Sequence, residues 1–143
     1  MTQNNGSILI VEDNSDDEEL MLFALAKAGI DKGIIILRDG ADAADFLSGA
    51  GMFSDRDVED MPHIIFLDYK LPKLTGLQVL ERLRSNVATA SLPIIIMTTA
   101  KEDSIAQECA RLGASGFVHK SLAFDEFVRA VKREIEVHCG HKS

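Results

Sequence analysis

The stretch ILIVEDNSDDEELMLFALAKAG, residues 8–29, contains one complete strand and helix unit. Residues Ile8–Val11 are apolar and mostly β-branched, which is typical of a strand buried on both faces of a sheet. Acidic residues follow at positions 16–19, Lys27 comes near the end of the segment, and Gly29 lies just beyond it. An α-helix favours acids in its first turn, a base in its last turn and a glycine after it. The stretch therefore predicts a β-strand followed by an α-helix.

The same alternation continues along the chain. Three more apolar runs and a weaker fourth follow, at Ile34–Leu37, Ile64–Leu67, Ile94–Met97 and Gly116–His119. The first three are again typical of strands buried on both faces, and the weaker run predicts an edge strand. Helical periodicity occupies the intervals after them, around residues 43–47, 77–83, 105–112 and 124–135. Five strands that alternate with five helices predict an α/β fold, in which right-handed crossovers join a parallel sheet with helices on both faces.

Length and composition are those of one globular domain. The chain has 143 residues, of which 46% are hydrophobic, and a domain of this size buries a core without disulfides or a structural metal. We expect a single domain over residues 1–143 with its core at about residues 7–137, so that no segment remains for an output domain. The stretch Gly49–Pro62 lacks apolar periodicity, and we expect it to be an exposed loop within this domain.

Charge and cysteine content restrict the partners and the compartment. The formal net charge is −8, which argues against direct binding to nucleic acid, because phosphate backbones are bound mainly by clustered lysine and arginine. No apolar run is long enough to span a membrane, and the polar start MTQNNG does not resemble a signal peptide, so we expect a soluble cytoplasmic protein. Cys109 and Cys139 are expected to be reduced thiols. His138, Cys139 and His141 would be a weak metal site, and we expect a frayed tail there instead.

Polar residues follow four of the five predicted strands. Glu12 and Asp13 come after the first run, Asp68 after the third, Thr98 after the fourth and Lys120 after the fifth. Because ligands of parallel sheets bind at the carboxyl ends of the strands, we expect these side chains to lie together. Three carboxylates at close range repel one another and raise a pKa unless a cation lies among them. Mg²⁺ prefers oxygen ligands and keeps waters that phosphoryl oxygens can replace, so this set with Lys120 suits phosphoryl transfer.

Each of these residues has a simpler interpretation when it is taken alone. An acid after a strand is often a helix cap or a solvated loop residue, a threonine there is uninformative, and Lys120 could be an edge lysine with a solvated amine. Asp68 is harder to explain in this way, since it follows four apolar residues and precedes a turn that contains proline. The conjunction of polar groups at four strand ends favours a functional site.

The chain resembles the receiver domain of two-component response regulators from Ile8 to about Val137. The resemblance rests on four motifs, which are ILIVEDN at 8–14, IIFLDYKLPKLTG at 64–76, PIIIMTTA at 93–100 and GASGFVHKS at 113–121. It implies a flavodoxin-like (βα)5 fold with strand order 2-1-3-4-5. The loop at 49–62 is longer than usual in the family, and in this the chain is similar to the stand-alone receivers that serve bacterial phytochromes and related hybrid-type kinases.

The resemblance also implies a role for each residue of the expected site. Asp68 corresponds to the phosphoacceptor, Thr98 to the hydroxyl that meets the phosphoryl group, and Lys120 to the lysine that offsets phosphoryl charge. Phe117 corresponds to the switch aromatic residue of the family. The implied ligands of Mg²⁺ are Glu12, Asp13, Asp68 and the backbone carbonyl of Lys70.

The activity implied by the resemblance is attack of the Asp68 carboxylate on a phosphohistidine of a sensor histidine kinase, giving an acyl phosphate that later hydrolyses. Thr98 then moves toward the phosphoryl group and Phe117 turns inward, which changes the surface made by residues 105–112, 116–119 and 124–135. The phosphorylated chain would signal by binding a downstream protein or by passing the phosphoryl group to a phosphotransfer protein. Receivers of this kind can also form homodimers through that surface. No enzymatic activity is expected beyond phosphoacceptance and self-dephosphorylation.

Three residues depart from the commonest pattern of the family. Ser121 replaces a frequent proline, which removes the usual reason to expect a cis peptide after Lys120 and leaves that bond open. Phe117 replaces a frequent tyrosine, so no signal can depend on a ring hydroxyl there. Thr99 is larger than the alanine often found beside the switch threonine, and we expect narrower access to the phosphate and slower dephosphorylation.

Three other functions are weighed against this one. A phosphohydrolase of the haloacid dehalogenase kind also forms an aspartyl phosphate, but it needs a second aspartate two residues after the nucleophile, where this chain has Lys70. A nucleotide or flavin module needs a glycine loop after the first strand, whereas residues 11–17 read VEDNSDD. A phosphorylation-independent scaffold with a receiver fold usually lacks acidic or lysine residues of the site, all of which are present here.

Overall fold

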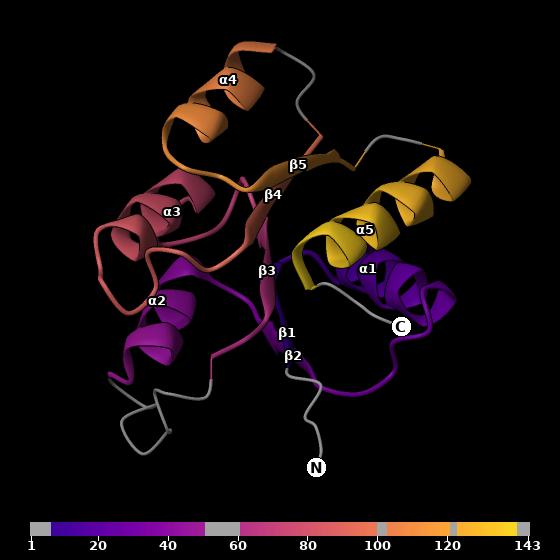
Figure 1. Ribbon diagram of the computed structural model, residues 1–143, viewed down its shortest axis with the longest axis horizontal. Coiled ribbons are helices and arrows are strands. Elements are labelled where there is room, and N and C mark those ends of the chain that lie inside the picture. Colours follow the sequence, from indigo (N-terminus) through magenta and orange to yellow (C-terminus); the bar gives the residue numbers. More distant parts are fainter. Residues whose placement is uncertain (1–6, 51–60, 100–102, 121–122, 140–143) are drawn as a thin grey trace.

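The computed structural model describes residues 7–50, 61–99, 103–120 and 123–139. Within these ranges five parallel strands form one sheet in the order β2-β1-β3-β4-β5 (Figure 1). The strands are β1 (Ile8–Val11), β2 (Ile34–Leu37), β3 (Ile64–Asp68), β4 (Ile94–Thr98) and β5 (Gly116–His119). The predicted parallel sheet, its strand order and the position of each strand are confirmed.

Five helices alternate with the strands and cover both faces of the sheet. They are α1 (Ser15–Lys27), α2 (Gly40–Ser48), α3 (Gly76–Arg84), α4 (Asp103–Arg111) and α5 (Phe124–Cys139). Figure 1 shows α1 and α5 on one face and α2 and α3 on the other, with α4 beyond the β5 edge on that second side. Each face has its own apolar cluster, in which Leu25 and Phe127 pack on the first face and Leu47 and Leu80 on the second. In the described part of the chain, no helix has the length and apolar character needed to cross a membrane.

The position of a strand in the sheet decides how deeply it is buried. β1, β3 and β4 are central and buried along their whole length. β2 is only half-buried at all four positions, so the prediction that Ile34–Leu37 is buried on both faces is wrong. The physical reason is that β2 pairs with β1 alone and forms an edge of the sheet. β5 forms the other edge, as predicted.

The structure differs from the sequence-based prediction at the C-terminal segment and at the end of the expected loop 49–62. α5 continues to Cys139, so His138 and Cys139 belong to a helix and the prediction of a frayed tail is wrong for them. The Nε2 atom of His138 lies 3.2 Å from Oε1 of Glu134, one turn earlier, and this contact supports the last turn. Pro62, at the end of the expected exposed loop, is buried. Residues 51–60 of that loop, Ser121 and His141 lie outside the described residues.

Arg84, the last residue of α3, joins two loops at the end of the sheet opposite to the strand ends that carry the acids. Its guanidinium donates to the carbonyl oxygen of Gly113 at 2.8 Å, to that of Ala90 at 3.0 Å and to Ser115 Oγ at 3.2 Å. Ser115 Oγ in turn accepts the backbone N–H of Ile94 at 3.0 Å, at the start of β4. One side chain therefore ties the end of α3 to the starts of β4 and β5.

We expect Arg84→Ala to lower the free energy of unfolding by about 2 kcal/mol, because hydrogen bonds from a charged donor are lost and the carbonyls must be rehydrated. Urea unfolding followed by circular dichroism measures this change. Arg82→Ala is the matched control, since Arg82 is exposed on the same helix. Equal stability of the two variants would contradict a structural role for the Arg84 contacts.

Candidate functional site

The carboxyl ends of four strands bring together the polar residues that the sequence singled out. Asp68 and Thr98 are the last residues of β3 and β4, while Glu12 and Lys120 directly follow β1 and β5. All four line one hollow of about 240 Å³, whose other lining residues are Asp13, Asn14, Asp17, Lys70 and Thr99. A larger hollow of about 450 Å³ shares Asp13 and Lys70 with it but contains neither Asp68 nor Lys120. The ion pair of Asp68 and Lys120 belongs to the smaller hollow, which is therefore the candidate site.

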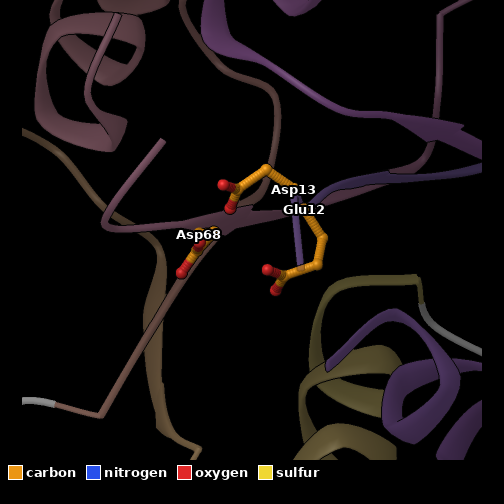
Figure 2. A group of neighbouring side chains, drawn as sticks. All are labelled: Glu12, Asp13 and Asp68. Carbon is orange, nitrogen blue, oxygen red and sulfur yellow. The ribbon is translucent and has the colours of Figure 1, made fainter. Parts of the chain in front are cut away.

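Three carboxylates in this hollow are close enough to share one cation. Glu12, Asp13 and Asp68 each offer one carboxylate oxygen, and these oxygens lie within 4.8 Å of one another. Figure 2 shows the three side chains gathered at the adjoining ends of their strands. Glu12 is completely buried and Asp68 is 5% exposed, whereas Asp13 is exposed. The cluster is thus open to solvent on the Asp13 side and closed by protein on the Glu12 side.

Lys120 balances part of this negative charge. Its Nζ atom lies 2.8 Å from Asp68 Oδ1 and 2.8 Å from Glu12 Oε1, and its side chain is 7% exposed. A third carboxylate, Asp17, accepts a hydrogen bond from the same amine at 2.9 Å. Burial lowers the pKa of Lys120, but its contacts with Asp68, Glu12 and Asp17 outweigh this effect and the net pKa is raised. The amine is therefore protonated at neutral pH.

The two buried carboxylates hold more negative charge than one lysine neutralises. Burial raises the pKa of Glu12 to about 7, with a further contribution from the charge of Asp68, although the contact with Lys120 acts against it. Burial also raises the pKa of Asp68, against the lowering effect of Lys120. No described donor forms a well-directed hydrogen bond to Glu12 Oε1 beyond the ion pair with Lys120. These oxygens fit a divalent cation, which prefers carboxylate ligands and would lower both pKa values.

We expect the affinity for a divalent cation to fall as the pH is lowered from 8 to 6. Metals bind the deprotonated carboxylate, and Glu12 takes up a proton in this range because its pKa in the folded chain is about 7. Calorimetric titration of Mg²⁺ in buffers of different ionisation enthalpy measures both the affinity and the number of protons released. A constant affinity with no proton release would contradict the raised pKa of Glu12.

The remaining predicted residues differ in how they meet the hollow. Thr98 is 3% exposed and faces it from the end of β4. Lys70 lies in the turn after β3 and Thr99 after β4, both with exposed side chains in the lining. Phe117 is not among the lining residues of the hollow. It lies half-buried in β5, where its ring is edge-on to that of His119 and the two ring centres are 5.0 Å apart. The structure thus groups five of the predicted residues around Asp68 and leaves Phe117 outside them.

Glycine is required behind Asp68 by close packing. Gly76 is the first residue of α3, and a Cβ atom added there would lie 2.4 Å from the carbonyl oxygen of Asp68 and 2.9 Å from Cα of Tyr69. Its backbone N–H donates to the Tyr69 carbonyl at 3.0 Å. A larger residue would displace the end of β3, so glycine at position 76 allows the backbone of Asp68 to keep its position.

Two residues of the hollow were not predicted as part of a site, namely Asn14 and Asp17. Asn14 is the N-cap of α1, and its side chain accepts the backbone N–H of Asp17 at 2.9 Å. The spacing of an asparagine three residues before an acid was the available signal for this cap. Nothing in the sequence indicated that the Asp17 side chain would reach Lys120, which lies 103 residues away.

Comparisons with known proteins find a matching family and similar solved structures. The chain matches the response regulator receiver domain over residues 8–132. It is 30% identical over 125 residues to the response regulator Rcp1 of Synechocystis sp., which covers 87% of this chain and 83% of Rcp1. The bacteriophytochrome response regulator RtBRR is 37% identical with a TM-score of 0.80, over 96% of this chain and 80% of that one. The Mn²⁺-bound form of Rcp1 is 28% identical with a TM-score of 0.82, over 96% and 97%. The flavodoxin-like fold is confirmed by these neighbours.

Proposed function

Since the chain belongs to the family of response regulator receiver domains, which accept phosphoryl groups in two-component signalling, we propose that Asp68 is its phosphoacceptor. The observation that carries this assignment is the position of Asp68 in the hollow. Its Oδ1 atom is 2.8 Å from the amine of Lys120, and its carboxylate lies within 4.8 Å of those of Glu12 and Asp13. A nucleophilic carboxylate between a fixed cation and a metal site suits attack on a phosphoryl group.

In the proposed reaction, a carboxylate oxygen of Asp68 attacks the phosphorus of a phosphohistidine on a sensor histidine kinase. The N–P bond breaks, its electron pair returns to the imidazole, and an acyl phosphate forms on Asp68. Lys120 stabilises the charge on the equatorial oxygens from one side. Glu12, Asp13, Asp68 and the backbone carbonyl of Lys70 would hold Mg²⁺, which when bound neutralises phosphoryl charge from the other side. The Mn²⁺-bound structure of Rcp1 supports a divalent metal for this family.

The partners proposed here follow from the family. The kinase is a sensor histidine kinase, and the likeness to RtBRR and Rcp1 favours one of phytochrome type. The phosphorylated chain then acts in the cytoplasm by binding a downstream protein, by passing the phosphoryl group on, or by pairing with a second copy through α4, β5 and α5. Thr98 and Phe117 are the proposed switch residues that alter this surface. Residues 1–143 act as a single receiver domain that performs no turnover other than hydrolysis of its own acyl phosphate.

The intact mass of the protein after incubation with acetyl phosphate tests the proposal. We expect a gain of one phosphoryl group that requires Mg²⁺ and that is lost again after the donor is removed. Folded protein that gains no phosphoryl group with any divalent metal would overturn the proposed function and favour a phosphorylation-independent scaffold. Release of inorganic phosphate from many phosphate esters would instead favour a phosphohydrolase.

A further inference from the structure

Asp17 and Lys120 belong to a closed ring of contacts at the start of α1. Lys120 Nζ lies between Glu12 Oε1 at 2.8 Å and Asp17 Oδ2 at 2.9 Å. The other carboxylate oxygen of Glu12 accepts the backbone N–H of Asn14 at 3.2 Å, and the Asn14 side chain accepts the backbone N–H of Asp17 at 2.9 Å. The N-cap of the helix thus holds Asp17 at a fixed distance from the amine.

Asp17 is separate from the group of carboxylates that could hold a metal. The oxygens within 4.8 Å of one another belong to Glu12, Asp13 and Asp68, and Asp17 is not among them. Its contact is with the lysine, to which it gives a well-directed hydrogen-bond acceptor. Of the four carboxylates in the hollow, three lie near the candidate metal position, whereas Asp17 contacts the amine without belonging to that group.

We infer that Asp17 is a positioning residue that holds the Lys120 amine in the orientation needed to meet a phosphoryl group on Asp68. This inference rests on the proposed function of the site. A lysine amine has three N–H donors, and in this structure the three carboxylates of Glu12, Asp17 and Asp68 surround it. When the acyl phosphate forms, the amine turns one donor from Asp68 to a phosphoryl oxygen, while the hydrogen bond to Asp17 and the ion pair with Glu12 keep the amine in place.

The physical basis is preorganisation of a flexible side chain. A lysine side chain has a large rotamer entropy, much of which must be lost before its amine can act at a fixed point. Anchoring Nζ from the α1 side removes that loss from the phosphorylation step. The Asp17 side chain is 33% exposed and that of Lys120 is 7% exposed, so solvent weakens the anchor without abolishing it.

The experiment compares Asp17→Ala and Asp17→Asn with the native protein and with Asp16→Ala. Asp16 is the exposed neighbour in the same first turn of α1, so its replacement controls for the loss of a helix-terminal acid. We measure the rate of phosphorylation by acetyl phosphate at saturating Mg²⁺, the lifetime of the acyl phosphate after donor removal, the Kd for Mg²⁺ and the melting temperature.

We expect Asp17→Ala to slow phosphorylation about fivefold, which is less than the tenfold or more of a fully buried charged hydrogen bond because Asp17 is partly exposed. Asp17→Asn, which keeps an acceptor oxygen, should recover at least half of the lost rate. The Kd for Mg²⁺ should change less than about twofold, since Asp17 is not a ligand. A merely structural role would lower the melting temperature without this rescue.

Three results would overturn the inference. These are an Asp17→Ala rate equal to that of Asp16→Ala, an Asp17→Asn rate no better than that of Asp17→Ala, or a large rise in the Kd for Mg²⁺ in Asp17→Ala. Should Asp17→Ala fail to fold, Asp17→Leu is compared with Asp16→Leu instead, because leucine also removes the acceptor, and equal rates of these two variants would overturn the inference. Failure of the proposed function is seen separately, since the native protein would then gain no phosphoryl group at all.

Discussion

Asp68→Asn is expected to abolish phosphorylation by acetyl phosphate completely while the fold is retained. The amide oxygen is a poor nucleophile, and no other carboxylate of the hollow has the position of Asp68 at the end of β3 beside Lys120. Intact mass spectrometry in the presence of Mg²⁺ measures the loss directly. Asp31→Asn, at an exposed position between α1 and β2, is the control for removal of one negative charge.

The same variant should be at least as stable as the native protein when no divalent metal is present. Burial raises the pKa of Asp68, and the charge of Asp68 contributes to raising the pKa of Glu12. The ionised Asp68 side chain therefore destabilises the folded state when no metal is bound. An uncharged side chain of the same shape removes that repulsion. The affinity for Mg²⁺ should fall by about tenfold or more, because Asp68 is one of the proposed ligands. Phosphorylation of Asp68→Asn to the native extent would refute the assignment of the phosphoacceptor.

The main features of the fold were predictable from the sequence because each one depends on local pattern. The runs at Ile64–Leu67 and Ile94–Met97 are apolar, β-branched and bounded by polar residues, and each became a buried central strand. Burial of the edge strand β2 was overestimated, since its sequence IIIL is as apolar as a central strand and only the sheet order reveals its position. The end of α5 was missed because the HCGH segment has no apolar periodicity to mark it.

The site was predictable to the extent that topology alone brings residues together. Parallel strands end at one edge, which places Glu12, Asp68, Thr98 and Lys120 around one hollow without any knowledge of packing. The contact of Asp17 with Lys120 could not be predicted, because it depends on how α1 is placed beside the end of β5. The hydrogen bonds of Arg84 could not be predicted for the same reason. They join Arg84 to Gly113 and Ser115, which lie 29 and 31 positions later in the chain.

Lys120→Met is expected to have the largest effect on stability of the changes considered. It leaves Glu12 completely buried and Asp68 nearly so, without the cation that now lies 2.8 Å from each. Removal of one partner from a buried ion pair costs about 3–5 kcal/mol. We therefore expect the free energy of unfolding in urea at pH 8 without metal to fall by about 3 kcal/mol, and phosphorylation to become undetectable.

The pH dependence of this loss distinguishes its electrostatic origin from lost packing. The pKa of Glu12 in the folded native chain is about 7 against 4.5 for the ordinary side chain, so the folded state binds more protons between these values and stability falls as the pH rises through them. Without the lowering effect of Lys120, this pKa rises further, so the fall extends to higher pH and becomes larger in total. Lys120→Met should therefore lose much less stability at pH 5 than at pH 8, and added Mg²⁺ should restore part of the loss at pH 8. Lys73→Met, an exposed lysine 3.3 Å from Asp39, is the matched control and should show neither effect. A loss of equal size at both pH values would mean that Lys120 contributes packing and not charge.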